Sequence, residues 1–212
     1  MLPDFEYKYN DEILKYMKEQ IWEAKNDISL YHKIAPLQFV HFYDEIGTPK
    51  DVLEVGSGLG RGTIYLNHLL NDDSVSYTLA DRTGYTTNSG AFNPSQDEFY
   101  NDLDLTKQFC EMNGLKNVET FDTELDDWGN LKKFDLIFSI CSFGMHVKIE
   151  RYMDRLLSVS KESTIMIFGV RHSSYTCDSF LNQFKSVNYK TIAEGPENPT
   201  RENWLILKNP KI

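Results

Sequence analysis

The stretch DVLEVGSGLGRGT, residues 51–63, decides the fold of this 212-residue chain. It begins with the apolar residues of a buried strand and continues through three glycines into a helical segment. Gly56, Gly58 and Gly60 carry no Cβ, so the main chain can turn tightly there and approach a ligand closely. At the start of the next helix, free backbone N–H groups and the helix dipole favour a carboxylate or a phosphate. The stretch therefore predicts a strand, a glycine turn and a helix that together hold an anionic group.

The spacing of the glycines distinguishes two kinds of ligand. A dinucleotide-binding turn has the pattern G-x-G-x-x-G, and counted from Gly56 its last glycine would fall at Arg61. The pattern here is G-x-G-x-G, and Glu54 stands two residues before it. In this the chain resembles the class I S-adenosylmethionine-dependent methyltransferases, whose first motif is an acidic residue followed by G-x-G-x-G at the end of the first strand. The resemblance implies that S-adenosylmethionine, with S-adenosylhomocysteine as product, is bound by Glu54, Gly56, Ser57, Gly58 and Gly60.

Composition describes an ordinary globular protein. Hydrophobic residues make up 41% and charged residues 25% of the chain, and its length suits one domain, residues 1–212, with a sizeable core. The cysteines have no C-x-x-C spacing, so neither a disulfide framework nor a zinc site is indicated, and a reducing cytoplasm fits best. No signal peptide and no apolar run of about 18 residues is found. We therefore expect a cytoplasmic protein without a membrane segment.

The net charge of the chain indicates which classes of binding partner are expected. The formal net charge is −10 and no basic cluster offsets it, which disfavours attraction to a phosphate backbone. No carboxylate trio with metal-ligand spacing stands out, so no metal is expected. The expected partner is a small-molecule substrate rather than nucleic acid or a membrane, and a homodimer is compatible with the sequence.

Helical and strand periodicities alternate along the chain, which indicates the α/β class. Residues 1–47 are predicted to form an N-terminal helical extension, with a first helix and a second one over Leu37–Tyr43. Strands are predicted at residues 52–55, 74–81, 118–121, 134–144, 163–171, 189–195 and 204–209, and later helices around 64–70, 102–113, 149–157 and 177–185. This predicts a Rossmann-like, seven-stranded, mostly parallel sheet with helices on both faces. The resemblance implies the strand order 3-2-1-4-5-7-6 with the last strand antiparallel.

Residues at the ends of the predicted strands are candidate site residues, because ligands of open parallel sheets bind beyond the carboxyl ends of the strands. Asp81 ends the second strand, where the resembled family binds the cofactor ribose; a cap on the next turn is the alternative. Asp122 and Thr123 end the third strand, where the family holds the adenine; a solvated acidic loop is the alternative. Ser139, in the fourth strand, would line the methionine side.

Two of the histidines follow predicted strands and are candidate general bases. His146 follows the fourth strand and His172 the fifth, and a histidine titrates near neutral pH, as a base for an acceptor hydroxyl should. The segment 134–153 resembles the corresponding region of bacterial enzymes assigned as sugar O-methyltransferases. A helix cap, or packing beside Phe143, is the alternative for His146.

Three further residues are candidates for substrate binding. Arg61 and Arg171 are expected at the ligand edge, where guanidinium groups suit carboxylate, phosphate or sulfate; ordinary surface arginines are the alternative. Residues 82–101 form a long polar stretch with several aromatics, Tyr85 among them, and are predicted to be a lid. A surface loop with incidental aromatics is the alternative.

The sequence thus favours an enzyme that transfers the methyl group of S-adenosylmethionine to an oxygen of a small molecule. A sugar or an anionic intermediate of surface (capsular) polysaccharide biosynthesis is the expected acceptor. Three alternatives stay open: a cofactor-binding partner subunit or sensor without catalysis, a dinucleotide-dependent oxidoreductase, which Arg61 disfavours, and an N-methyltransferase, although the N-P-P-Y motif of nucleobase-amine enzymes is absent.

Overall fold

The computed structural model describes residues 2–20, 27–86, 98–142, 147–171, 179–192 and 202–212. In these ranges no helix is both long and apolar enough to cross a membrane.

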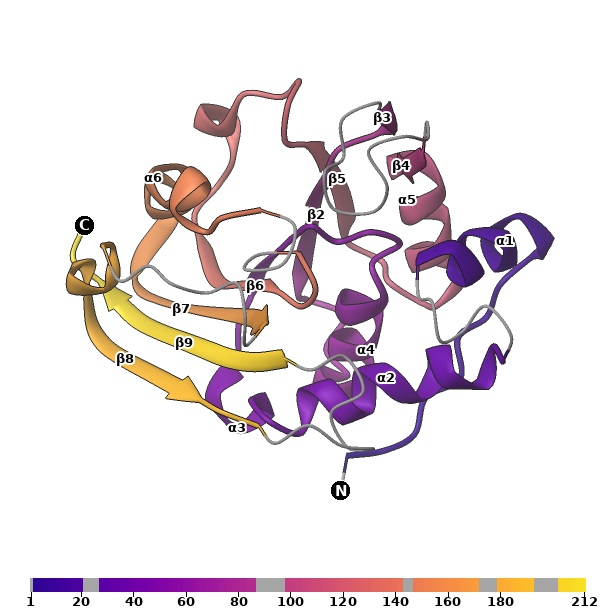
Figure 1. Cartoon of the computed structure of the whole chain (residues 1–212), viewed down its shortest axis with the longest axis horizontal. Coiled ribbons are helices and arrows are strands. Elements are labelled where there is room, and N and C mark those ends of the chain that lie inside the picture. Colours follow the sequence, from indigo (N-terminus) through magenta and orange to yellow (C-terminus); the bar gives the residue numbers. More distant parts are fainter. Residues whose placement is uncertain (1, 21–26, 87–97, 143–146, 172–178, 193–201) are drawn as a thin grey trace.

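A seven-stranded sheet forms the centre of the molecule (Figure 1). Its strands, in spatial order, are β5 (Val118–Asp122), β2 (Ser76–Asp81), β1 (Asp51–Val55), β6 (Phe134–Ser139), β7 (Ser160–Arg171), β9 (Glu202–Pro210) and β8 (Phe184–Lys190). The first five are parallel to one another, and β9 is antiparallel to both β7 and β8. Counted along the chain this is the order 3-2-1-4-5-7-6, so the predicted topology is confirmed.

Both faces of the sheet are covered, as predicted for an α/β fold. The helices that pack on one face are α1 (Asp11–Gln20), α2 (Ser29–Phe39), α4 (Arg61–Leu70) and α5 (Leu103–Met112), and α6 (Glu150–Ser158) packs on the other. Side chains of β1 alternate between the two cores, Val52 facing the first and Leu53 the second. As expected for a central parallel strand covered on both sides, four of the five residues of β1 are buried.

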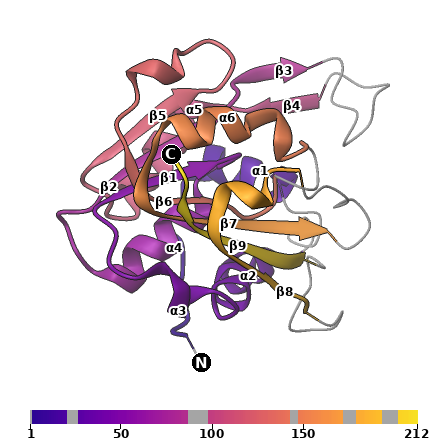
Figure 2. The same cartoon turned by 90° about the vertical axis from the view of Figure 1, so that its left-hand side faces the viewer.

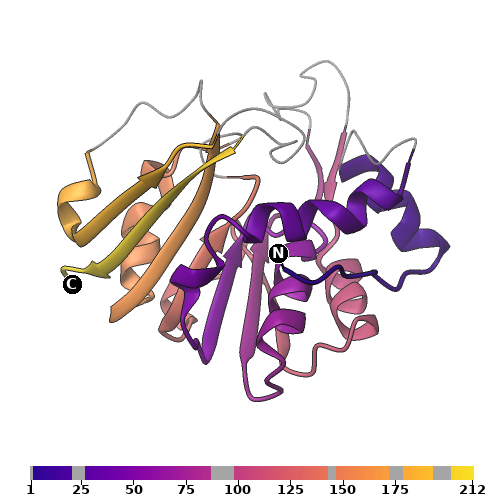
Figure 3. The same cartoon turned by 90° about the horizontal axis from the view of Figure 1, so that it is seen from below.

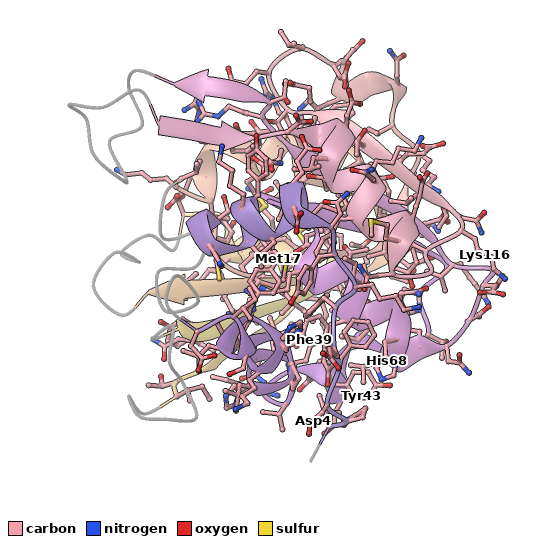
Figure 4. The ribbon with its side chains drawn as sticks, turned by 90° about the vertical axis from the view of Figure 1, so that its right-hand side faces the viewer. Asp4, Met17, Phe39, Tyr43, His68 and Lys116 are labelled. Atoms are coloured by element: carbon pink, nitrogen blue, oxygen red, sulfur yellow. The ribbon has the colours of Figure 1, made fainter. Side chains whose placement is uncertain are left out.

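The N-terminal extension lies along one side of the molecule, near α4 (Figure 3). Met17 of α1 and Phe39 of α2 are fully buried on the side shown in Figure 4. The predicted helix over Leu37–Tyr43 is wrong in its bounds: α2 runs from Ser29 to Phe39, and a separate short helix, α3, covers Tyr43–Ile46. The cause is burial, since α2 buries residues of one helix face already before Leu37, namely Tyr31, Ile34 and Ala35.

Several predicted bounds after β5 also need correction. β6 ends at Ser139 rather than at 144, and β8 begins at Phe184, inside the segment 177–185 that was predicted to be helical. β8 is the edge strand, and five consecutive residues after Phe184 are exposed. A strand that faces solvent on both sides has no apolar alternation to reveal it.

The stretch 82–101 is not a plain loop. Its two ends pair as an antiparallel ribbon, β3 (Gly84–Thr86) with β4 (Glu98–Asn101), which projects beyond β2 in Figure 2. Residues 87–97, between these strands, lie outside the described residues.

Candidate functional site

The glycine turn after β1 depends on two positions where a side chain would not fit. Gly56 and Gly60 have φ angles of 68° and 79°, in the left-handed region that L-residues rarely adopt. A Cβ on Gly56 would overlap the side chain of Ser142, and a Cβ on Gly60 would overlap Leu79 and lie 2.9 Å from Cys110 Sγ. The glycines are therefore required both for the shape of the turn and for its close packing.

Three neighbouring elements hold the turn in place. From β2, the carbonyl of Ala80 accepts a hydrogen bond from Gly56 N–H at 2.8 Å. Asn101, at the end of β4, donates through Nδ2 to the Gly58 carbonyl at 3.0 Å, and the Thr106 hydroxyl of α5 lies 2.8 Å from the same oxygen. Asn101 and Thr106 are both buried and were not predicted from the sequence. Their partner, Gly58, lies more than 40 residues away in the sequence, so no local sequence motif predicts these hydrogen bonds.

Asp81 is the acidic group of the site. It ends β2, and its two carboxylate oxygens accept hydrogen bonds from Gly58 N–H at 2.7 Å and from Arg82 N–H at 2.8 Å. Burial raises the pKa of Asp81 to about 6, although both of these hydrogen bonds favour the charged form. Near neutral pH the group is therefore mostly a carboxylate held in a fixed orientation.

A pocket opens at the carboxyl ends of β1, β2, β5 and β6, with about 290 Å³ of space, part of it open to solvent. Its lining residues are Val55, Gly56, Asp81, Arg82, Thr123, Ser142, Val147 and Tyr152. β1 lies between β2 and β6 in the sheet, which makes this the switch point where α/β sheets bind ligands. The enclosed volume is only about 30 Å³, far below the roughly 300–1,000 Å³ usual for small-molecule sites.

Glu54 lies behind the turn, not in the pocket lining. Its Oε2 accepts hydrogen bonds from Thr63 N–H at 3.0 Å and from the Thr63 hydroxyl at 2.6 Å. A Cβ on Gly62 would lie 2.6 Å from Glu54 Oε1, so the absence of a side chain at this position of α4 leaves room for the carboxyl group. Burial raises the pKa of Glu54 to about 7, against the lowering effect of the Thr63 hydrogen bonds and of the nearby Arg61 charge. The group fixes the first turn of α4 against β1.

The residues predicted at the third and fourth strand ends lie in different surroundings. Thr123 lines the pocket and donates its N–H to the Asp81 carbonyl at 2.9 Å. Asp122 folds back onto its own loop, where Oδ1 accepts from the N–H groups of Glu124 and Leu125 at 2.9 and 3.1 Å. Ser139 is fully buried at the end of β6. Of these three, only Thr123 lines the pocket.

Arg61, the first residue of α4, is buried beneath the N-terminal extension. Its Nη2 lies 3.9 Å from Cys141 Sγ, and its carbonyl accepts a hydrogen bond from the Tyr7 hydroxyl at 3.1 Å. The structure thus places Arg61 beside the end of β6, outside the pocket lining.

The remaining predicted residues are not placed by the structure. His146 and His172 lie outside the described residues, as do the side chains of Tyr85 and Arg171. Over the described ranges, no group of three or more histidine, cysteine, aspartate or glutamate side chains could hold a metal ion.

Comparison with known proteins finds similarity in structure rather than in sequence. No protein-family model and no curated protein matches the chain. The O-methyltransferase TomG of Streptomyces achromogenes, crystallised with S-adenosylmethionine, aligns with a TM-score of 0.56 and 13% identity over 96% of this chain and 92% of its own. A methyltransferase from Geobacter sulfurreducens aligns with a TM-score of 0.55 and 15% identity over 95% of this chain and 91% of its own.

A third solved structure is longer than this chain. It is a protein of Nostoc punctiforme with an inferred O-methyltransferase activity, which aligns with a TM-score of 0.54 and 12% identity over 82% of this chain; the match spans 55% of the Nostoc protein. At such identities the likeness is one of fold.

Proposed function

We propose that this chain, which has the fold of class I S-adenosylmethionine-dependent methyltransferases, binds S-adenosylmethionine and transfers its methyl group to an oxygen of a small molecule. The observation that carries the proposal is Asp81, a buried carboxylate fixed by two backbone N–H groups in a pocket at the sheet's switch point. A carboxylate in that position suits the two hydroxyls of a ribose, each of which can donate a hydrogen bond to it.

The residues present fit the proposed cofactor. Asp81 would accept the ribose hydroxyls, Thr123 would lie at the adenine end with Asp122 behind it, and the methionine part would pass over Gly56 and the end of β6. The missing Cβ at Gly56 lets Ser142 pack directly on the turn. Ser57 and Gly58 are proposed to contact the cofactor through their backbone groups rather than through side chains. When bound, the cofactor supplies an electrophilic methyl group on a sulfonium centre.

The chain's own contribution is orientation and the handling of one proton. Methyl transfer to oxygen needs the acceptor, the methyl group and the leaving sulfur in line, and such alignment with exclusion of water contributes several kcal/mol. For an alcohol acceptor we propose His146 or His172 as the base, which on the usual scale is worth about 10² to 10⁴-fold. Residues 82–101 would cover the acceptor, with Tyr85 against it and Arg171 near an anionic group.

The acceptor is proposed to be a sugar or an anionic intermediate of surface polysaccharide synthesis, in the cytoplasm. This rests on the resemblance of segment 134–153 to sugar O-methyltransferases and on the arginines expected at the ligand edge. Every acceptor in a test panel should therefore carry a free hydroxyl, and half of the panel should carry an acidic group as well.

A methyl-transfer assay tests the proposal. The protein is incubated with S-adenosylmethionine and the panel, release of S-adenosylhomocysteine is measured, and His146→Ala and His172→Ala are compared with the exposed-residue control Asp154→Asn. We expect acceptor-dependent release that falls at least about 100-fold in one histidine variant and stays unchanged in Asp154→Asn. Tight binding of S-adenosylhomocysteine without release for any acceptor would instead favour the non-catalytic sensor or partner subunit.

A further inference from the structure

The large apolar side chains that are exposed among the described residues gather along one edge of the sheet. Two of them, Val187 and Tyr189, lie on β8 and are each 42% exposed, and two more, Val40 and Ile212, are 50% and 57% exposed. The fifth, Leu125, follows β5 at the opposite edge. Exposed apolar side chains that gather in one place mark an interaction surface, whereas scattered ones do not.

Val40 and Ile212 lie at the two ends of β8. Ile212 follows Lys211, whose N–H donates a hydrogen bond at 2.7 Å to the carbonyl of the residue before β8. Val40 precedes His41, whose carbonyl accepts a hydrogen bond at 3.1 Å from Nζ of Lys190, the last residue of β8. Figure 1 shows the same arrangement, with the C-terminus beside the start of β8 and α3 near its end. The exposed apolar groups therefore follow the whole length of the strand.

The outer side of β8 pairs with no other strand among the described residues. β8 is the last strand of the sheet, and its ladder is with β9. Proteins usually protect such an edge with a proline, a charge within the strand or a covering element. Residues 186–189 are exposed and contain neither a proline nor a charge, whereas in β5, at the other edge, only the charged Glu119 is exposed. The edge of β8 is therefore suited to pairing with a further strand.

The sequence of β8 is suited to pairing with a second copy of itself. Val187 is the midpoint of this seven-residue strand, so two antiparallel copies overlap over the full strand only when Val187 lies opposite Val187. In that register Lys185 lies opposite Tyr189 of the second copy, which allows a cation–π contact. The end residues Phe184 and Lys190 lie opposite each other, so no lysine faces a lysine.

The same arrangement brings the apolar groups at the two ends together. Antiparallel strands place the start of one copy beside the end of the other, so Ile212 of each copy lies near Val40 of the other. At this end the charge of Lys190 is offset by Glu45, whose Oε1 lies 3.1 Å from Lys190 Nζ. Every exposed apolar side chain of this edge therefore has a counterpart across the two-fold axis.

We propose that the outer edge of β8 is the interface of a symmetric homodimer, in which two β8 strands pair antiparallel with Val187 at the two-fold axis. The two sheets then continue into one another, and the main-chain groups of each edge form hydrogen bonds with the other copy. The pocket lies at the carboxyl ends of β1, β2, β5 and β6, so the proposal does not depend on what the pocket binds.

Sedimentation equilibrium of the full chain tests the proposal. The wild type should be dimeric at about 100 μM, since a small strand-edge interface gives weak rather than tight association. Val187→Lys and Val187→Glu should each weaken dimerisation at least about 100-fold, because like charges then meet at the axis and two buried valines are lost. An equal mixture of the two variants should recover the dimer, because opposite charges then meet. Leu125→Lys, at the opposite edge, is the control and should dimerise like the wild type.

Disulfide trapping measures the register directly. Opposite residues of an antiparallel pair have Cα atoms about 4.5–5.5 Å apart, within reach of a disulfide. Val187→Cys should therefore form a cross-linked dimer under mild oxidation. Asn188→Cys, which would lie opposite Ser186, should stay at the level of the wild type, in which the partly exposed Cys141 sets the background. These small replacements keep the test decisive even if a charge at position 187 prevents folding.

The proposal is overturned if the wild type is monomeric at about 100 μM, or if the dimer persists in both charge variants, which would place the interface elsewhere. It is also overturned if the mixture does not recover the dimer, or if Asn188→Cys cross-links as well as Val187→Cys, because each result contradicts a register centred on Val187. Circular dichroism of every variant verifies that it is folded.

Discussion

Replacing Gly56 by alanine tests the turn at its tightest point. At φ 68° an L-residue is disfavoured by roughly 1–2 kcal/mol. The new Cβ would also lie closer than 3.0 Å to both Cβ and Oγ of Ser142, and such overpacking costs typically about 1–3 kcal/mol. Together these give an expected loss of about 2–5 kcal/mol in the free energy of unfolding.

Gly47 supplies the matched control. Its φ is 70°, almost the same as that of Gly56, but a Cβ built there meets no atom within 4 Å. Gly47→Ala should therefore show a conformational cost without a clash, about 1–3 kcal/mol, because its ψ of −142° lies in a region essentially confined to glycine. The double variant Gly56→Ala with Ser142→Gly should recover the part of the Gly56→Ala loss that comes from the contact with Ser142.

The assay is equilibrium unfolding in urea, followed by tryptophan fluorescence, with binding of S-adenosylhomocysteine measured in parallel. Gly56→Ala should lose both stability and affinity, while Gly47→Ala should lose only stability. Strict additivity of Gly56→Ala and Ser142→Gly would refute the packing argument.

Three other predictions concern two groups that hold the site and one ion-pair group that joins α3 to β8 and β9. Folding raises the pKa of Glu54 from 4.5 to about 7, so the folded state holds an extra proton in that window and loses stability as the pH rises through it. As the pH rises from 4.5 to 7, the free energy of unfolding of Glu54→Gln should therefore increase relative to that of the wild type by up to about 3 kcal/mol, at about 1.4 kcal/mol per pKa unit. Urea unfolding of the two proteins across this pH range measures the difference, and a difference that does not change with pH would disprove the prediction. Asn101→Ala removes the 3.0 Å hydrogen bond to Gly58 and should cost about 1 kcal/mol of stability together with some affinity for S-adenosylhomocysteine, and unchanged affinity would separate Asn101 from the site. Glu45 pairs with Lys190 at 3.1 Å and Lys208 at 2.6 Å, but these partly exposed pairs are screened, so Glu45→Gln should cost only about 1 kcal/mol or less; a loss that does not shrink in high salt would contradict an ion-pair role.

Most of the fold could be predicted because its centre is buried on both faces. β1, β2 and β6 are buried along nearly their whole length, and the glycine turn marks where the first strand ends. β8 could not be found in the same way, since its exposed side chains follow no burial pattern. The bounds of α2 were missed because its buried face begins at Tyr31, ahead of the segment that looked helical.

The site was predictable only where a strand end coincides with a motif. Asp81 lies in the pocket as the end of β2 suggested. Glu54 belongs to the same motif, yet alternation along β1 turns it to the α4 side, where it bonds to Thr63. Asn101 and Thr106 reach Gly58 from more than 40 residues away, and such contacts appear only when the chain is folded.

The most direct test of the central claim is calorimetric titration of S-adenosylhomocysteine into the wild type and into Asp81→Asn. The account predicts one site per chain in the wild type, affinity about 10- to 100-fold weaker in the variant, and a decline of wild-type affinity below pH 6, where Asp81 takes up a proton. Asparagine can still accept the hydrogen bond from Gly58 N–H, so the variant should stay folded. A wild-type protein that binds no S-adenosylhomocysteine, or equal affinity in the two proteins, would contradict the account.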